Sequence, residues 1–334
     1  MNTNPFAAVK MAAPSAVTRS VRPVAMTLAC VMAAVAVALP DSPPLDGTFA
    51  GVTETVIVEA PQPRYVAPTL RDRIGRIWAP VYINEQGPFR LVLDTGANRS
   101  AVIGRVATSL GGILSGSGNA QLRGTTGSAI VPMIDVDRLQ VGDLLIEATQ
   151  LPILPDAFGG ADGVLGYDGL RDKRIFIDFG NDLITIKRSQ NERARPGYVT
   201  LPMRFLHDFI PMIDVYVGRT RVKAIIDTGA QRSIANGALF ELLRRRGNAI
   251  LPATVTGVTL DEMAGQALDI ADIQMGGLSI PRLLVTFGDA YIFDYWKLGD
   301  VPAIMLGMDV LGTVDKLVID YRRREVQLRL RKQD

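Results

Sequence analysis

The chain has 334 residues, enough for about two domains of ordinary size. Hydrophobic residues make up 48% and charged residues 21% of the sequence, which allows a sizeable core and excludes wholesale disorder. The formal net charge of +2 gives no reason to expect nucleic acid or an anionic membrane surface as a partner. With one cysteine, Cys30, and one histidine, His207, the chain can form neither an intramolecular disulfide nor a Cys-rich or His-rich metal site. We therefore expect no metal and no cofactor.

The first 45 residues have the pattern of a secretory signal peptide or signal anchor. Lys10, Arg19 and Arg22 precede an uncharged apolar block at residues 24–39, and a proline-rich stretch ends it. The block is short for a membrane span of about 20 residues, which favours cleavage, but anchoring by residues 24–39 stays open. The sequence thus predicts an exported protein, periplasmic or secreted. Residues 46–76 are predicted to be a linker or N-terminal extension, and whether they act as a prosegment is left open.

After this extension the same series of elements is predicted twice. In the first copy the series is a hairpin over residues 81–93, a Gly-rich loop or hairpin tip over 111–128, strands over 130–136 and 144–154, an apolar-apolar-Gly segment at 164–166 and a closing hairpin over 174–186. In the second copy it is a hairpin over 213–226, an amphipathic helix over 237–245, an apolar-apolar-Gly segment at 305–307 and a closing hairpin over 316–330. We expect an all-β, mainly antiparallel fold with a few short helices, built as two lobes by internal duplication. The predicted boundaries are 77–190 for the N-terminal lobe and 191–334 for the C-terminal lobe.

The strongest signal is a motif that ends one strand of each copy. An apolar run stops at Asp94-Thr95-Gly96-Ala97 in the first copy and at Asp227-Thr228-Gly229-Ala230 in the second, and Arg-Ser follows two residues later in both. One such motif would be an ordinary turn at the end of a strand. Two copies with matching neighbours predict a pair of carboxylates brought together between the lobes.

Paired carboxylates at about 3 Å cannot both ionise easily, so they share a proton. The ionised member can activate a water as general base while the protonated member donates to a substrate carbonyl. We therefore assign Asp94 and Asp227 as the candidate catalytic residues. Thr95 and Thr228 could lock the two turns by hydrogen bonds, and Gly96 and Gly229 allow tight turns whose N–H groups face the carboxylates.

The pairing of each aspartate motif with a later apolar-apolar-Gly segment resembles the retropepsin-like aspartic proteases. The two pairs are Leu93 to Ala97 with Val164-Leu165-Gly166, and Ile226 to Ala230 with Met305-Leu306-Gly307. The resemblance covers roughly residues 77–334. It implies a bilobal acid-protease fold with the active site between the lobes and a peptide or protein substrate. Two lobes in one chain follow the pepsin-like arrangement, and the resemblance implies a monomer.

The same resemblance assigns supporting roles to other residues. It implies that the segments ending in Gly166 and Gly307 hold the loops that carry the two aspartates, where Ala97 and Ala230 also lie. A substrate-covering flap is expected at Gly124, Thr125, Thr126 and Gly127, with a counterpart in the second lobe near residues 257–265.

Some interpretations stay open at this point. A catalytically silent peptide-binding module on the same bilobal fold is the alternative to an aspartic endopeptidase, and intermolecular pairing of lobes is a third, disfavoured reading. His207 is expected to be a surface or interlobe residue rather than a catalytic one. Trp296 and the segment 291–293 could line a substrate cleft, although packing in the core is at least as good an explanation.

Overall fold

The computed structural model describes residues 56–59, 76–111, 118–141, 144–156, 159–181, 183–190, 192–244 and 249–330. The described residues are mostly β, with 54% in strands and 11% in helices. The predicted signal segment and most of the predicted extension lie outside the described residues. Within the described ranges, no helix is both long enough and apolar enough to cross a membrane.

The first lobe is built on a seven-stranded sheet with the order β2-β3-β8-β4-β7-β6-β5, in which β2 also pairs with β6. Its central pairings are parallel between β3 and β8 and between β4 and β7, while β4 and β8 are antiparallel. Its elements are β2 (Trp78–Ile83), β3 (Gln86–Leu93), β4 (Ala101–Ile103), α1 (Gly104–Ser109), β5 (Asn119–Arg123), β6 (Ser128–Val141), β7 (Leu144–Leu154), β8 (Gly163–Leu165) and the 3₁₀ turn η1 (Tyr167–Gly169).

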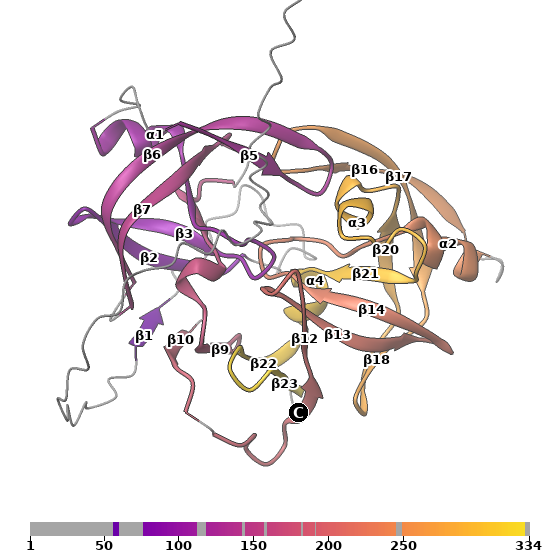
Figure 1. The fold of residues 1–334 in the computed structure, drawn as a ribbon. Coiled ribbons are helices and arrows are strands. Elements are labelled where there is room, and N and C mark those ends of the chain that lie inside the picture. The colour runs from indigo at the N-terminus through magenta and orange to yellow at the C-terminus, as the bar shows by residue number, and fades with distance from the viewer. Residues whose placement is uncertain are drawn as a thin grey trace, which may run out of the picture.

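The second lobe repeats this pairing pattern in a larger sheet, whose main path is β16-β17-β20-β15-β21-β14-β13-β18-β19. Here β14 and β21 are parallel, β15 and β20 are parallel, and β15 and β21 are antiparallel. Figure 1 shows this lobe in orange and yellow beside the indigo and magenta first lobe. Its elements are β12 (Arg204–Leu206), β13 (Ile210–Val217), β14 (Thr220–Ile226), β15 (Ile234–Ala235), α2 (Gly237–Leu243), β16 (Ile250–Thr256), β17 (Glu262–Ile270), β18 (Ile273–Met275), β19 (Leu278–Ile280), β20 (Leu283–Phe287), α3 (Tyr291–Tyr295), β21 (Ala303–Leu306) and α4 (Met308–Leu311).

A six-stranded sheet with the order β1-β10-β9-β22-β23-β11 joins the two lobes. Strands β9 (Lys173–Asp178) and β10 (Leu183–Arg188) follow the first lobe, whereas β22 (Val314–Asp320) and β23 (Glu325–Leu330) end the second. Antiparallel pairing of β9 with β22 makes the connection. The edges are β1 (Val56–Glu59) and β11 (Val199–Pro202), so part of the predicted extension belongs to this sheet.

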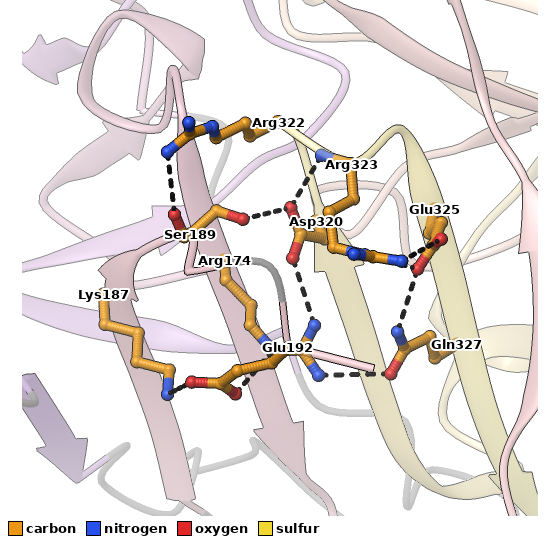
Figure 2. Close-up of polar contacts among 9 residues, drawn as sticks. All are labelled: Arg174, Lys187, Ser189, Glu192, Asp320, Arg322, Arg323, Glu325 and Gln327. Atoms are coloured by element: carbon orange, nitrogen blue, oxygen red, sulfur yellow. Dashed lines mark hydrogen bonds and ion pairs between the residues drawn. The ribbon is translucent and has the colours of Figure 1, made fainter. Parts of the chain in front are cut away.

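A buried polar cluster fastens the same sheet across the lobes (Figure 2). Arg174 on β9 donates to the Asp320 carboxylate on β22 at 3.1 Å and to the Gln327 side-chain oxygen on β23 at 3.1 Å. The Ser189 hydroxyl donates to the second Asp320 oxygen at 2.6 Å. The Asp320 side chain is fully buried, so these partners replace the water that its charge would otherwise require.

The strands that carry the Asp-Thr-Gly motifs end in fully buried residues in both lobes. Leu91, Val92 and Leu93 at the end of β3 have no exposed surface, and the same holds for Ile225 and Ile226 at the end of β14. Each of these strands pairs on one side with an antiparallel strand and on the other with a parallel one. Continuous apolar runs, rather than alternating ones, are typical of strands covered on both faces.

Candidate active site

The two predicted aspartates lie side by side where the lobes meet, close enough that each carboxyl group shifts the pKa of the other. Each is held by the loop that follows it. The Gly96 and Ala97 N–H groups donate to Asp94 Oδ1 at 2.8 and 3.0 Å. In the second lobe, the N–H groups of the matching glycine and alanine, residues 229 and 230, donate to Asp227 Oδ1 at 2.9 and 3.0 Å.

The threonines of the two motifs lock these loops together across the lobes. Thr95 Oγ1 donates to the Ile226 carbonyl at 2.6 Å, and Thr228 Oγ1 donates to the Leu93 carbonyl at 2.7 Å. Each threonine N–H also donates to the hydroxyl of the other threonine, at 3.1 and 3.2 Å. Both side chains are fully buried, so this reciprocal network fixes one loop relative to the other.

Glycine is required in both motifs because each loop packs against the opposite carboxyl group. A Cβ atom at Gly96 would lie 2.9 Å from the Asp227 carboxyl, and one at Gly229 would lie 2.4 Å from the Asp94 carboxyl carbon. A side chain at either position would therefore push the two carboxyl groups apart. The glycines allow the contact on which a shared proton depends.

The apolar-apolar-Gly segments hold the aspartate loops from behind, as the resemblance implied. The Asp94 N–H donates to the Leu165 carbonyl at 3.0 Å, and the Asp227 N–H donates to the Leu306 carbonyl at 3.1 Å. A Cβ at Gly166 would lie 2.5 Å from the backbone of the first loop, and a Cβ at Gly307 would lie 2.7 Å from that of the second. Both glycines thus permit a close backbone approach.

Four supporting residues were not predicted as parts of the site. The Ser100 hydroxyl donates to Asp168 Oδ1 at 2.7 Å and accepts from the Gly166 N–H at 3.1 Å. The second lobe repeats this link through the Ser233 hydroxyl, which donates to Asp309 at 2.6 Å and accepts from the Gly307 N–H at 3.1 Å. The sequence signal was present, because serine and aspartate recur at matching places in both copies.

The environment of the pair favours one retained proton. Burial and, next, the negative charge of Asp94 together raise the pKa of Asp227 to about 8, against the opposing effect of the loop N–H groups. Burial also raises the pKa of Asp94, but the N–H groups of its own loop and the positive charge of Arg76 favour its ionised form. The pair therefore keeps one proton at neutral pH, with Asp94 as its readier anion.

A cleft of about 410 Å³ opens over the two carboxyl groups. Both lobes line it, and so do the hairpins β5–β6 and β16–β17. Gly124 and Thr125 of the predicted flap face this cleft, together with Gly257 and Val258 of the second hairpin. Arg76, at the start of the first described stretch of the lobe, also lines it and was not predicted as a site residue.

The tips of the two hairpins contact each other above the cleft. The Thr126 hydroxyl donates to the Asp261 carbonyl at 2.8 Å. A Cβ at Gly127 would lie 2.3 Å from the Asp261 carboxylate, and one at Gly124 would lie 2.7 Å from Val258. Thr126 and Gly127 thus bridge the hairpins, while Gly124 and Thr125 face the cavity.

His207 does not line the cleft; its ring stacks on Tyr295 at 5.8 Å. Burial lowers the pKa of this histidine.

Comparison with known protein families gives a match within the first lobe. Residues 79–172 match the model of the family described as "gag-polyprotein putative aspartyl protease". The N-terminal lobe is similar to the retropepsin-like aspartyl proteases. The match to this retropepsin-like lobe includes Asp94 and Gly166 and supports a general aspartic protease function. No curated protein gave a significant match to the chain.

Proposed function

We propose that the protein is an aspartic endopeptidase that hydrolyses peptide bonds with the Asp94–Asp227 pair. The observation that carries the proposal is the close approach of the two aspartates, each packed against the glycine of the other motif, at the floor of a cleft lined by both lobes. The family match covers the first lobe only, and the repeated strand pairing supports a second lobe derived by internal duplication.

The chemistry follows from the proton that the pair retains. The Asp94 carboxylate takes a proton from a water molecule, whose oxygen attacks the carbonyl carbon of the peptide bond. The Asp227 carboxyl donates its proton to the carbonyl oxygen, giving a neutral tetrahedral diol. Collapse of the diol breaks the C–N bond, with a proton passing to the leaving nitrogen, and releases a carboxylic acid and an amine.

A peptide library incubated with the wild type, Asp94→Asn and Asp227→Asn tests this proposal. We expect either substitution to lower kcat/KM at least about 100-fold, because each removes a general acid–base group. Asp137→Asn is the matched control, since Asp137 is exposed on β6 and does not line the cleft. A statine-type transition-state analogue should inhibit the wild type.

Undiminished cleavage by both dyad variants would overturn the proposal. Wild-type protein that binds peptides but cleaves none between about pH 3 and pH 8 would instead identify a catalytically silent peptide-binding module.

A further inference from the structure

The two halves of the cleft differ in one connection between strands. In the first lobe, residues 155–162 join β7 to β8; the corresponding residues 288–302, which join β20 to β21, are nearly twice as many. The longer connection contains α3, whereas the described part of the shorter one contains no helix. Ile292 and Trp296 from the longer connection line the cleft, whereas none of the described residues of the shorter one does.

The walls on the two sides also differ at matching strand positions. Ala101 on β4 pairs with Val164 on β8, and at the matching positions of the second lobe Ile234 on β15 pairs with Met305 on β21. Ala101 therefore corresponds to Ile234, and Val164 corresponds to Met305. All four residues line the cleft. The second-lobe side chain is the larger at both positions. The side chains contributed by α3 come in addition to this difference.

These larger side chains form a hydrophobic cluster of their own. Ile234, Met305, Ile292 and Trp296 belong to one buried cluster, in which the Trp296 ring packs edge-on against Phe293 at 6.3 Å. The first-lobe wall, by contrast, belongs to the main core. Both clusters are close-packed and resist movement, so the larger side chains of the second-lobe wall keep that side of the cleft narrow.

The first-lobe flap contacts α3 and covers the cleft on that side. The Ile292 N–H donates to the Thr125 carbonyl at the flap tip at 3.3 Å. The Arg123 guanidinium lies over the Tyr295 ring, 4.3 Å from its centroid. The flap of the first lobe therefore rests on α3 of the second, which limits the height of the cleft on that side.

We propose that α3 gives the cleft a different substrate preference on each side of the cleaved bond. The first-lobe subsite accepts large apolar side chains, while the second-lobe subsite, narrowed by Ile292 and Trp296, accepts small ones. This inference rests on the proposed peptidase function, because it concerns the residues on either side of the bond that is cleaved. Ile292 and Trp296 are then specificity-determining residues.

Peptides that carry Phe or Ala on each side of the cleaved bond test the proposal. For the wild type we expect a preference for Phe on one side and for Ala on the other. Ile292→Ala should raise kcat/KM for Phe on the Ala-selective side at least about tenfold, without changing the preference on the other side. Leu154→Ala, on β7 at the first-lobe side of the cleft, is the matched variant and should alter only the Phe-selective side. Ile292→Val, with a smaller loss of packing, should give a weaker shift in the same direction if Ile292→Ala does not fold.

Equal preferences on the two sides in the wild type, or an equal effect of Ile292→Ala on both, would overturn the inference. If the wild type cleaves no peptide, the proposed function fails separately. The same comparison is then made with Kd values of non-cleavable reduced-amide peptides, where a missing Ile292-dependent difference overturns the specificity inference itself.

Discussion

Ser100 and Ser233 each connect an aspartate-bearing loop to the segment that supports it. Each hydroxyl donates to an aspartate carboxylate and accepts from the glycine N–H of the apolar-apolar-Gly segment. Ser100 has no exposed surface and Ser233 has almost none, so water cannot replace a lost bond. The serines therefore act on the dyad indirectly, as positioning residues.

Ser100→Ala should destabilise the fold by about 1–3 kcal/mol, because the Gly166 N–H is left buried without an acceptor. It should also lower kcat on the order of tenfold with little change in KM, since a displaced loop misplaces Asp94 without removing the substrate contacts. Thermal unfolding and steady-state kinetics measure the two effects. Ser279→Ala, which removes an exposed hydroxyl bonded to Asp272, serves as the control. A variant that loses stability with unchanged kcat would contradict the positioning role.

At this scale, the repeated motif was enough to predict that Asp94 and Asp227 form a pair. Their partners were harder to predict. The bond between Ser100 and Asp168 joins residues 68 positions apart, and the recurrence of this serine and aspartate in both copies does not by itself say that the two side chains meet. The pairing of β8 with β3 and with β4 brings the two segments together.

Among the elements, the hairpin β5–β6 lies where the flap was expected, and its turn spans residues 124–127. The glycines and threonines of this region predicted a loop or hairpin tip, and the family resemblance implied that it is the flap. Helix α3 was not predicted as a helix, because five residues are too few to show helical periodicity. Its aromatic residues were equally compatible with the core, and the structure shows that Trp296 both packs in a buried cluster and lines the cleft.

In the whole molecule, the six-stranded sheet sets how the lobes sit against each other and so how the two carboxyl groups meet. The hairpins β9–β10 and β22–β23 were predicted from their turn residues. Their pairing across the lobes was not, because residues from Lys173 onward and from Val314 onward are far apart in the chain. The sheet also includes β1, from the predicted extension, and β11, from the predicted C-terminal lobe.

Arg174→Met should destabilise the protein by about 3–5 kcal/mol, because it leaves the Asp320 carboxylate buried without its opposite charge. Urea unfolding measures the loss. Arg105→Met is the control: Arg105 also forms ion pairs, with Asp156 and Asp162, but its side chain is 47% exposed, and its removal should change the midpoint little. Similar effects of the two substitutions would show that the cluster in Figure 2 does not fasten the lobes.

The shared proton is the central claim, and a carbon-13 NMR titration of the aspartate carboxyl carbons tests it most directly. Because the pKa of Asp227 in the folded protein is raised to about 8, its proton stays bound as the pH rises past 3.8 and is released near pH 8. We predict one carboxyl signal that titrates near pH 8 in the wild type and moves to lower pH in Asp94→Asn, which lacks the neighbouring charge. If every aspartate signal of the wild type instead titrates near pH 4, the two carboxyl groups do not share a proton and the account is contradicted.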